Sequence, residues 1–201
     1  MQAGFYFDQT ACTRCCTCIV ACKDWHDLPA GPASFIRIKS TEKGKFPDVS
    51  VHHMFLSCFH CVEPACIPAC PANAIRKRED GIVVVDRDAC LGKEKCQMCL
   101  EVCPYEAPQF GAEKKATMQK CDLCAERLAE KKKPICVDAC PMYALDAGPI
   151  EELRAKHGDV REAEGFTYSP KLKPSIVMRP RKDTKGRSIQ KVVVTPPRNV
   201  T

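Results

Sequence analysis

Cysteine is the residue type whose number and spacing in this sequence could do chemistry. The chain has 201 residues and 17 cysteines, and an odd number of thiols cannot pair completely into disulfides within one chain. All but Cys16 fall into four groups of four, which points to metal binding. The groups are Cys12-x₂-Cys15-x₂-Cys18-x₃-Cys22, Cys58-x₂-Cys61-x₄-Cys66-x₃-Cys70-Pro71, Cys90-x₅-Cys96-x₂-Cys99-x₃-Cys103-Pro104 and Cys121-x₂-Cys124-x₁₁-Cys136-x₃-Cys140-Pro141.

The spacing within these groups is typical of iron–sulfur ligands. Three cysteines two residues apart can wrap a short loop around one face of a four-iron cube. In the bacterial run C-x₂-C-x₂-C-x₃-C-P the last cysteine binds a second cluster. Structural zinc instead favours two Cys-x₂-Cys pairs with a longer spacer. The groups therefore predict four [4Fe-4S] clusters. We interpret Cys16, between two predicted ligands, as a small buried residue facing away from the cluster rather than a spare ligand.

Charge and hydropathy exclude several other classes of protein. The formal net charge is +6 with every thiol counted as neutral. Each [4Fe-4S] core with four thiolates carries about −2, so four clusters would bring the total to about −2. The basic excess is then counter-charge, and we expect no nucleic-acid partner. No apolar run is long enough to predict a membrane span. The first residues resemble no secretory signal, so we expect a cytoplasmic protein, attached to a membrane or exported only through a partner.

Short elements must position the cysteines. Apolar spacing and turn residues predict strands at Phe5–Asp8, Phe35–Ile38 and Val51–Leu56, and helices at Cys18–Lys23, Asp122–Lys133 and Ile150–His157. The Asp80-Gly81 pair between two apolar runs predicts a β-hairpin that joins the second and third groups. Residues Leu28–Pro47 are expected to be mostly connection because they contain several Gly and Pro residues.

These elements predict an α+β fold of two bacterial-ferredoxin-like modules in pseudo-twofold arrangement, each holding two [4Fe-4S] clusters, followed by an extended tail. Residues 1–27 and 105–150 would form one module, residues 28–48 a linker and residues 49–104 the other module. Residues 151–201 would form a helix and a Pro-rich tail. Two interpretations of the tail stay open. It is either disordered or packs on a partner subunit through its apolar islands at Ser175–Met178 and Val192–Val194.

Several longer motifs resemble one known family over about residues 1–180. They are Cys22-Lys23-Asp24-Trp25, Cys58-Phe59-His60-Cys61, Cys66-Ile67-Pro68-Ala69-Cys70-Pro71, Arg78-Glu79-Asp80-Gly81-Ile82-Val83-Val84-Val85-Asp86, Lys133-Pro134-Ile135-Cys136 and Pro174-Ser175-Ile176-Val177-Met178-Arg179-Pro180. The sequence resembles the four-cluster iron–sulfur subunits of the dimethyl sulfoxide reductase family of molybdenum and tungsten enzymes.

The resemblance implies crossed sets of ligands, in which three cysteines of one group join the last cysteine of another. Cluster 1 would be held by Cys12, Cys15, Cys18 and Cys140, and cluster 2 by Cys121, Cys124, Cys136 and Cys22. Cluster 3 would be held by Cys58, Cys61, Cys66 and Cys103, and cluster 4 by Cys90, Cys96, Cys99 and Cys70.

The resemblance also implies partners and a function. The chain would relay single electrons between a large molybdenum- or tungsten-pterin catalytic subunit near cluster 1 and a distal redox partner near cluster 4, with no catalytic residue of its own. The family spaces its third group x₂-x₂-x₃, whereas Lys93-Glu94-Lys95 widens the first gap here. The distal partner is therefore open between a membrane anchor and a soluble electron carrier. Two other classes are a free-standing polyferredoxin carrier and a structural or regulatory cluster protein.

Other residues that could suggest chemistry are interpreted more simply. We expect His52, His53 and His60 to pack or to form hydrogen bonds, because Cys fills every expected ligand position. Trp25 is interpreted as a core residue rather than an electron conduit. The basic residues near the clusters, Lys23, Arg76 and Lys120, are interpreted as solvated surface charges, the alternative being that they raise cluster potentials. No glycine-rich phosphate loop is present, so no nucleotide or flavin site is expected.

Overall fold

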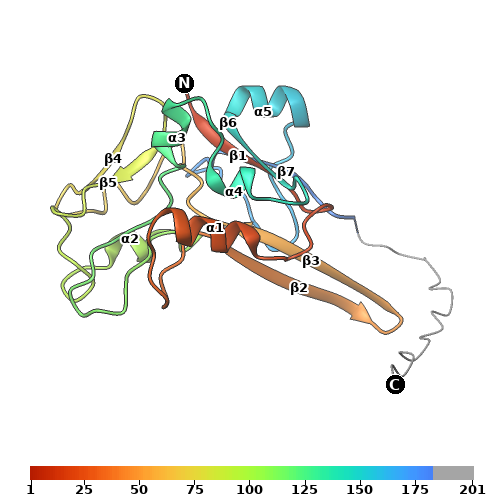
Figure 1. Ribbon diagram of the computed structural model, residues 1–201, viewed down its shortest axis with the longest axis horizontal. Coiled ribbons are helices and arrows are strands. Elements are labelled where there is room, and N and C mark those ends of the chain that lie inside the picture. Colours follow the sequence, from red (N-terminus) through yellow and green to blue (C-terminus); the bar gives the residue numbers. More distant parts are fainter. Residues whose placement is uncertain (183–201) are drawn as a thin grey trace, which may run out of the picture.

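A buried three-stranded sheet lies at the centre of the protein (Figure 1). The computed structural model describes residues 1–182. Strand β1 (Ala3–Asp8) is the middle strand and pairs antiparallel with β6 (Leu145–Pro149) and parallel with β7 (Ile176–Arg179). All six residues of β1 are buried, and the strand begins two residues before the predicted Phe5–Asp8. Gly4 allows a close approach, because a Cβ there would lie 2.5 Å from the Ser175 carbonyl oxygen.

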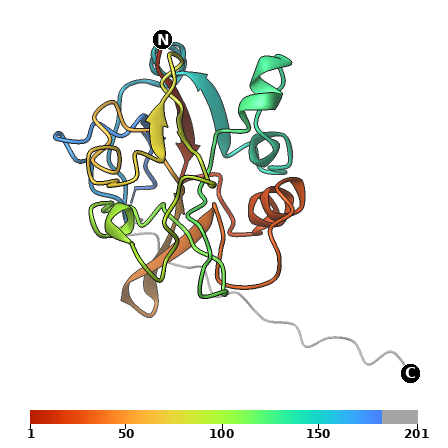
Figure 2. The same cartoon turned by 90° about the vertical axis from the view of Figure 1, so that its left-hand side faces the viewer.

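Short helices pack beside and on this sheet. Helix α1 (Thr17–Trp25) lies against α4 (Ile135–Asp138), although the two are far apart in the sequence (Figure 2). Helix α5 (Ile150–His157) packs on all three strands and has the bounds predicted from the sequence. Segments 1–27 and 105–150, assigned to one module, therefore meet through β1 with β6 and α1 with α4. The module boundaries and the pseudo-twofold arrangement stay predictions.

A long hairpin extends from one side of the molecule (Figure 1). It consists of β2 (Arg37–Lys45) and β3 (Asp48–Leu56), paired in register along their whole length. The prediction that residues 28–47 are mostly connection holds for residues 28–36 but misses the strand over residues 37–45. The strand expected at Phe35–Ile38 begins at Arg37 and continues for nine residues.

The second half of the cysteine-rich region has little regular structure. Strands β4 (Ile75–Lys77) and β5 (Val83–Val85) form the predicted hairpin, and Gly81 in its turn has a φ of 83°. Helix α2 has four residues (Met98–Glu101), and α3 has five (Ala125–Ala129). The helix predicted over Asp122–Lys133 is thus much shorter. Residues Leu123, Cys124 and Lys131 have positive φ values, so the backbone cannot be helical there.

The beginning of the predicted tail belongs to the fold of this chain. Strand β7 is inserted beside β1, and Ile176, Val177 and Met178 are buried. The prediction that the island at Ser175–Met178 packs on a partner is therefore wrong. The second island, Val192–Val194, lies outside the described residues. Within residues 1–182, no helix has the length and apolar character that crossing a membrane requires.

Aromatic side chains and cysteines share the main hydrophobic core. Phe5, Phe7 and Phe55 lie at its centre, with Phe5 and Phe55 in edge contact at 5.5 Å between ring centroids. The same core includes several cysteines of the predicted sites, Cys18, Cys22, Cys58, Cys121 and Cys136. Because the thiols are part of the core, occupation of the metal sites and packing of the fold are coupled.

Candidate metal centres

The four cysteine groups occupy loops that end in short helices. The first group runs from the end of β1 into α1, and the second begins directly after β3. The third group ends in and just beyond α2, and the fourth surrounds α3 and α4. No disulfide is formed by any cysteine in residues 1–182. The thiols are therefore available as ligands.

Two cavities are lined by cysteines from different groups. The thiols around the first cavity belong to Cys58, Cys61, Cys66 and Cys103. Those around the second include Cys12, Cys15, Cys18 and Cys140. In each cavity, three cysteines of one group meet the last cysteine of another. The fold thus brings together the residues that the resemblance implies for clusters 3 and 1.

Electrostatic interactions show which of the remaining thiols lie near one another. Burial raises the pKa of Cys136 well above its ordinary value, and the neighbouring thiols that add to this shift include Cys121, Cys124 and Cys22. Burial, together with smaller contributions from the thiols of Cys90, Cys96 and Cys70, raises the pKa of Cys99 to about 11. The widened gap after Cys90 therefore leaves that residue beside the other three.

Thiols of one set also act on thiols of the next. Burial is the main cause of the raised pKa of Cys22, Cys121 and Cys66, but smaller contributions come from the adjacent set. Cys18 of the first set contributes to the raised pKa of Cys22 in the second. Cys58 of the third set acts on Cys121 in the second, and Cys99 of the fourth set acts on Cys66 in the third. Neighbouring sets are therefore close enough to interact electrostatically.

Most of the buried thiols would remain protonated without a cation. Burial, with smaller contributions from nearby thiols, raises the pKa of Cys18, Cys22 and Cys66 to about 12. Iron ligation requires thiolates, and the positive charge of the metal offsets the cost of burying them. A group of buried cysteines around one cavity thus fits a multi-iron cluster, which supplies several positive charges at one place.

A backbone repeat that sequence analysis missed follows the three Cys-Pro pairs. The third residue after each of these cysteines has a φ near +50°, namely Asn73, Glu106 and Tyr143. The fourth residue is alanine in each copy, and its N–H donates to the cysteine Sγ. The N···S distances are 3.3 Å for Ala74, 3.5 Å for Ala107 and 3.3 Å for Ala144. Such bonds tune the potential of a bound cluster. The recurring Cys-Pro-x-x-Ala motif is the sequence signal that could have revealed them.

Cys16 differs from the sequence-based expectation. It is half-buried and lines the same cavity as Cys12, Cys15, Cys18 and Cys140, so the interpretation as a buried residue facing away from the site was wrong. Its Sγ donates to the Arg14 carbonyl at 3.4 Å, and its φ of 62° lies in the left-handed region. The site thus has a fifth sulfur at its rim.

The histidines contact other protein groups, in agreement with their interpretation. His60 is fully buried, and its Nδ1 accepts a hydrogen bond of 3.0 Å from the Val83 N–H. Burial lowers the pKa of His60 well below its ordinary value, so the ring is neutral at physiological pH. His53 Nδ1 lies 2.9 Å from Ser40 Oγ, and His52 is buried.

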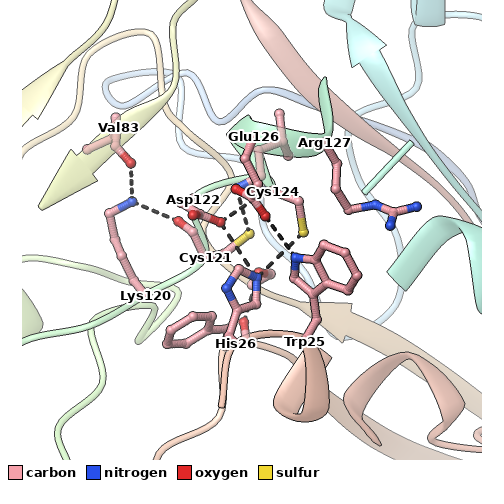
Figure 3. A network of polar contacts seen from close by, with 12 residues as sticks. Trp25, His26, Val83, Lys120, Cys121, Asp122, Cys124, Glu126 and Arg127 are labelled. Atoms are coloured by element: carbon pink, nitrogen blue, oxygen red, sulfur yellow. Dashed lines mark hydrogen bonds and ion pairs between the residues drawn. The ribbon is translucent and has the colours of Figure 1, made fainter. Parts of the chain in front are cut away.

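Two further interpretations need correction (Figure 3). Trp25 is 44 % exposed and lies at the surface, where its Nε1 donates to Glu126 at 2.8 Å. Lys120 is only 6 % exposed and is therefore not a solvated surface charge, whereas Arg76 is exposed as expected. His26, which follows Trp25, lies 3.5 Å from the Sγ of Cys124 through its Nε2.

Comparison with known proteins agrees with the cysteine geometry. Residues 49–150 match the family described as the 4Fe-4S dicluster domain, which defines the class as an iron–sulfur protein. The sequence is 46 % identical over 187 residues to one of the chains of the anaerobic dimethyl sulfoxide reductase of Escherichia coli, covering 89 % of both. It is 35 % identical to a sulfite dehydrogenase subunit of Allochromatium vinosum, over 92 % of this chain and 85 % of that one. Protein NrfC of Escherichia coli is 34 % identical, over 90 % of this chain and 81 % of that protein.

The chain therefore belongs to the iron–sulfur subunits of the dimethyl sulfoxide reductase family of molybdenum and tungsten oxidoreductases. It is an electron-transfer subunit that carries iron–sulfur clusters and does not itself catalyse a reaction on a substrate. This confirms the family and function predicted from the cysteine motifs.

Proposed function

We propose that the chain holds four [4Fe-4S] clusters and passes electrons along them in a row. The four crossed ligand sets are Cys12, Cys15, Cys18 and Cys140; Cys121, Cys124, Cys136 and Cys22; Cys58, Cys61, Cys66 and Cys103; and Cys90, Cys96, Cys99 and Cys70. The observation that supports this proposal is the electrostatic interaction between thiols of successive sets, which is consistent with the order 1, 2, 3, 4. When bound, each cluster accepts and releases one electron.

The protein shields part of this relay from water. In the second set all four thiols, those of Cys22, Cys121, Cys124 and Cys136, are buried and shielded from water. The first set reaches the surface at Cys15, and Cys90 and Cys96 of the fourth set are half-buried. Electrons would therefore enter and leave at the two ends of the row, while the second site is shielded from water.

The partners follow from the relatives. The relatives include a chain of a dimethyl sulfoxide reductase and a subunit of a sulfite dehydrogenase. By similarity to them, the end at cluster 1 would receive a molybdenum- or tungsten-pterin catalytic subunit. The end at cluster 4 would meet a membrane anchor or a soluble electron carrier. The cytoplasmic location stays a prediction.

Iron content of the native complex tests the number of clusters. We expect about 16 iron atoms per chain, with co-elution of a large molybdenum- or tungsten-containing subunit in gel filtration. An iron content of about 12 atoms per chain, or a [3Fe-4S] signal in electron paramagnetic resonance (EPR), would contradict the presence of four [4Fe-4S] clusters. Elution of the loaded chain alone would favour a free-standing carrier.

A pair of variants tests the ligand assignment. Cys99→Ser removes a proposed ligand of cluster 4 and should lower both iron content and yield, because ligation and folding are coupled. Cys16→Ser changes a cysteine outside the proposed sets and should leave about 16 iron atoms per chain. If Cys16→Ser lost iron and Cys99→Ser did not, the ligand assignment would be disproved.

A further inference from the structure

Lys120 is an unusual residue because it is a buried cation. Among the lysines and arginines of residues 1–182, it alone is buried, with 6 % of its surface exposed. It immediately precedes Cys121, a proposed ligand of cluster 2. Long charged side chains are seldom buried without an anionic partner, because moving the charge out of water is costly. Its position therefore requires a compensating group.

The side chain has polar partners but no carboxylate. The Nζ donates to the carbonyl oxygen of Cys121 at 2.9 Å and to that of Val83, as Figure 3 shows. None of the carboxylates in residues 1–182 forms an ion pair with Lys120. Two carbonyl dipoles satisfy two of its three N–H donors and leave the full charge and one donor unmatched.

The side chain lies between the cysteines of two proposed metal sites. Lys120 lines the cavity of Cys58, Cys61, Cys66 and Cys103 and hydrogen-bonds the backbone of Cys121 in the neighbouring set. Burial raises the pKa of Cys66 to about 12, and Lys120 is the cation that opposes this rise. Val83 links Lys120 to His60, since its carbonyl accepts from Lys120 and its N–H donates to the neutral imidazole.

We propose that Lys120 is a positioning residue for charge, a fixed ammonium at the junction of clusters 2 and 3 that raises the reduction potentials of both. This inference rests on the proposed ligand sets. An electron that arrives at either site makes its cluster more negative by one charge, and the buried ammonium stabilises that state without a proton being taken up. The effect is strong because little water separates the charges. Clusters 2 and 3, which connect the two halves of the relay, are thereby made easier to reduce.

Replacement of the charge provides the test. Lys120→Met keeps the length and apolar stem of the side chain but removes the ammonium. In the native complex, titration followed by EPR should show two of the four midpoint potentials falling, each by about tenfold in the reduction equilibrium, which is about 59 mV for one electron. The other two potentials should remain unchanged, because clusters 1 and 4 lie beyond the junction.

Two control variants separate charge from structure. Lys120→Arg retains the positive charge and should keep both potentials within a small shift of the wild-type values. The side chain of Lys77 is a partly exposed cation near Cys61, and its Nζ donates to the Val62 carbonyl at 2.8 Å. Lys77→Met should shift the potentials much less, because water screens this charge. If Lys120→Met loses a cluster, a loaded Lys120→Arg with wild-type potentials still supports the proposal.

Several results would overturn the inference. Unchanged potentials in loaded Lys120→Met would show that the charge does not act on the clusters. Loss of clusters from both Lys120 variants would assign the residue to its carbonyl contacts alone, and an equal shift in Lys77→Met would exclude a special role of the buried site. The wild-type iron content and number of EPR signals test the ligand sets separately, so failure of the proposed function can be distinguished.

Discussion

The interior metal site of Cys121 and Cys136 differs from the end site around Cys15 in how its thiols join the fold. Cys121 and Cys136 are buried within the main hydrophobic core, and burial raises the pKa of both thiols well above its ordinary value. Cys15 is exposed, and the Thr17 hydroxyl, 3.5 Å from its Sγ, lowers its pKa. All four thiols of this interior site are thus buried, whereas the end site has one exposed thiol, Cys15, beside Cys18, which is buried in the same core.

This difference indicates that the two kinds of site serve different needs. A buried site requires metal to compensate several thiolates in a medium of low polarity, so its loss removes support from the surrounding core. An exposed site is supported by water and can be approached by a partner, at a smaller structural cost. Stability should therefore depend mainly on the interior sites.

The largest effect should come from serine in place of an interior ligand. Cys121→Ser removes a thiolate and leaves a weak hydroxyl ligand inside the core, so we expect soluble yield to fall severalfold and iron to fall to about 12 atoms or fewer. Cys15→Ser is the matched variant at the end of the row, and it should cost at most one cluster with yield close to wild type. Iron analysis and soluble yield measure both, and equal loss of yield would abolish the distinction.

A second pair of variants compares the aromatic residues beside the two kinds of site. Phe59 is 1 % exposed, lines the cavity of Cys58, and contacts the rings of Tyr105 and Phe166 at centroid distances of 5.3 and 5.2 Å. Phe59→Ala should lower the free energy of unfolding by about 3–5 kcal/mol because it leaves a cavity. Tyr143, three residues after Cys140, is 87 % exposed. Tyr143→Ala should therefore change the free energy of unfolding by no more than about 0.5 kcal/mol.

Urea unfolding followed by circular dichroism under anaerobic conditions gives both values. The two residues are both aromatic and both follow a proposed ligand closely, so burial is the main variable between them. A large loss of stability in Tyr143→Ala would show that the end site also depends on aromatic packing within this chain.

Local sequence signals predicted the parts of the fold that depend on local chemistry. The Asp80-Gly81 turn and the helix at Ile150–His157 were predicted because turn residues and helix-ending glycine act within a few residues. Strand β2 was mostly missed, since Arg37–Lys45 is polar and largely exposed and is held by pairing with β3. The insertion of β7 beside β1 joins residues about 170 positions apart, and no local pattern encodes such a partner.

The cysteine positions were readable from spacing, whereas their surroundings were not. The shortened helix α3 illustrates why, because the left-handed residues Leu123 and Cys124 shape the metal loop and override the helical pattern. The burial of Lys120 was also missed, since a lysine is normally solvated and only the assembled cavity reveals its position. Tertiary environment, rather than residue type, determines these features.

The smallest effect is expected at Trp25, which lies on the outer side of the cluster 2 site. Its indole donates to Glu126 at 2.8 Å, and the Arg127 guanidinium lies 4.7 Å from the ring centroid, but the residue is 44 % exposed. Trp25→Phe removes the hydrogen bond and weakens the cation–π contact, so it should cost about 0.5 kcal/mol of stability. Cluster potentials and electron-transfer rates should stay at wild-type values, because the indole carries no charge. Stopped-flow reduction of the loaded complex measures the rate, and slower transfer in Trp25→Phe would show that a surface aromatic residue, and not only the buried junction, controls the relay.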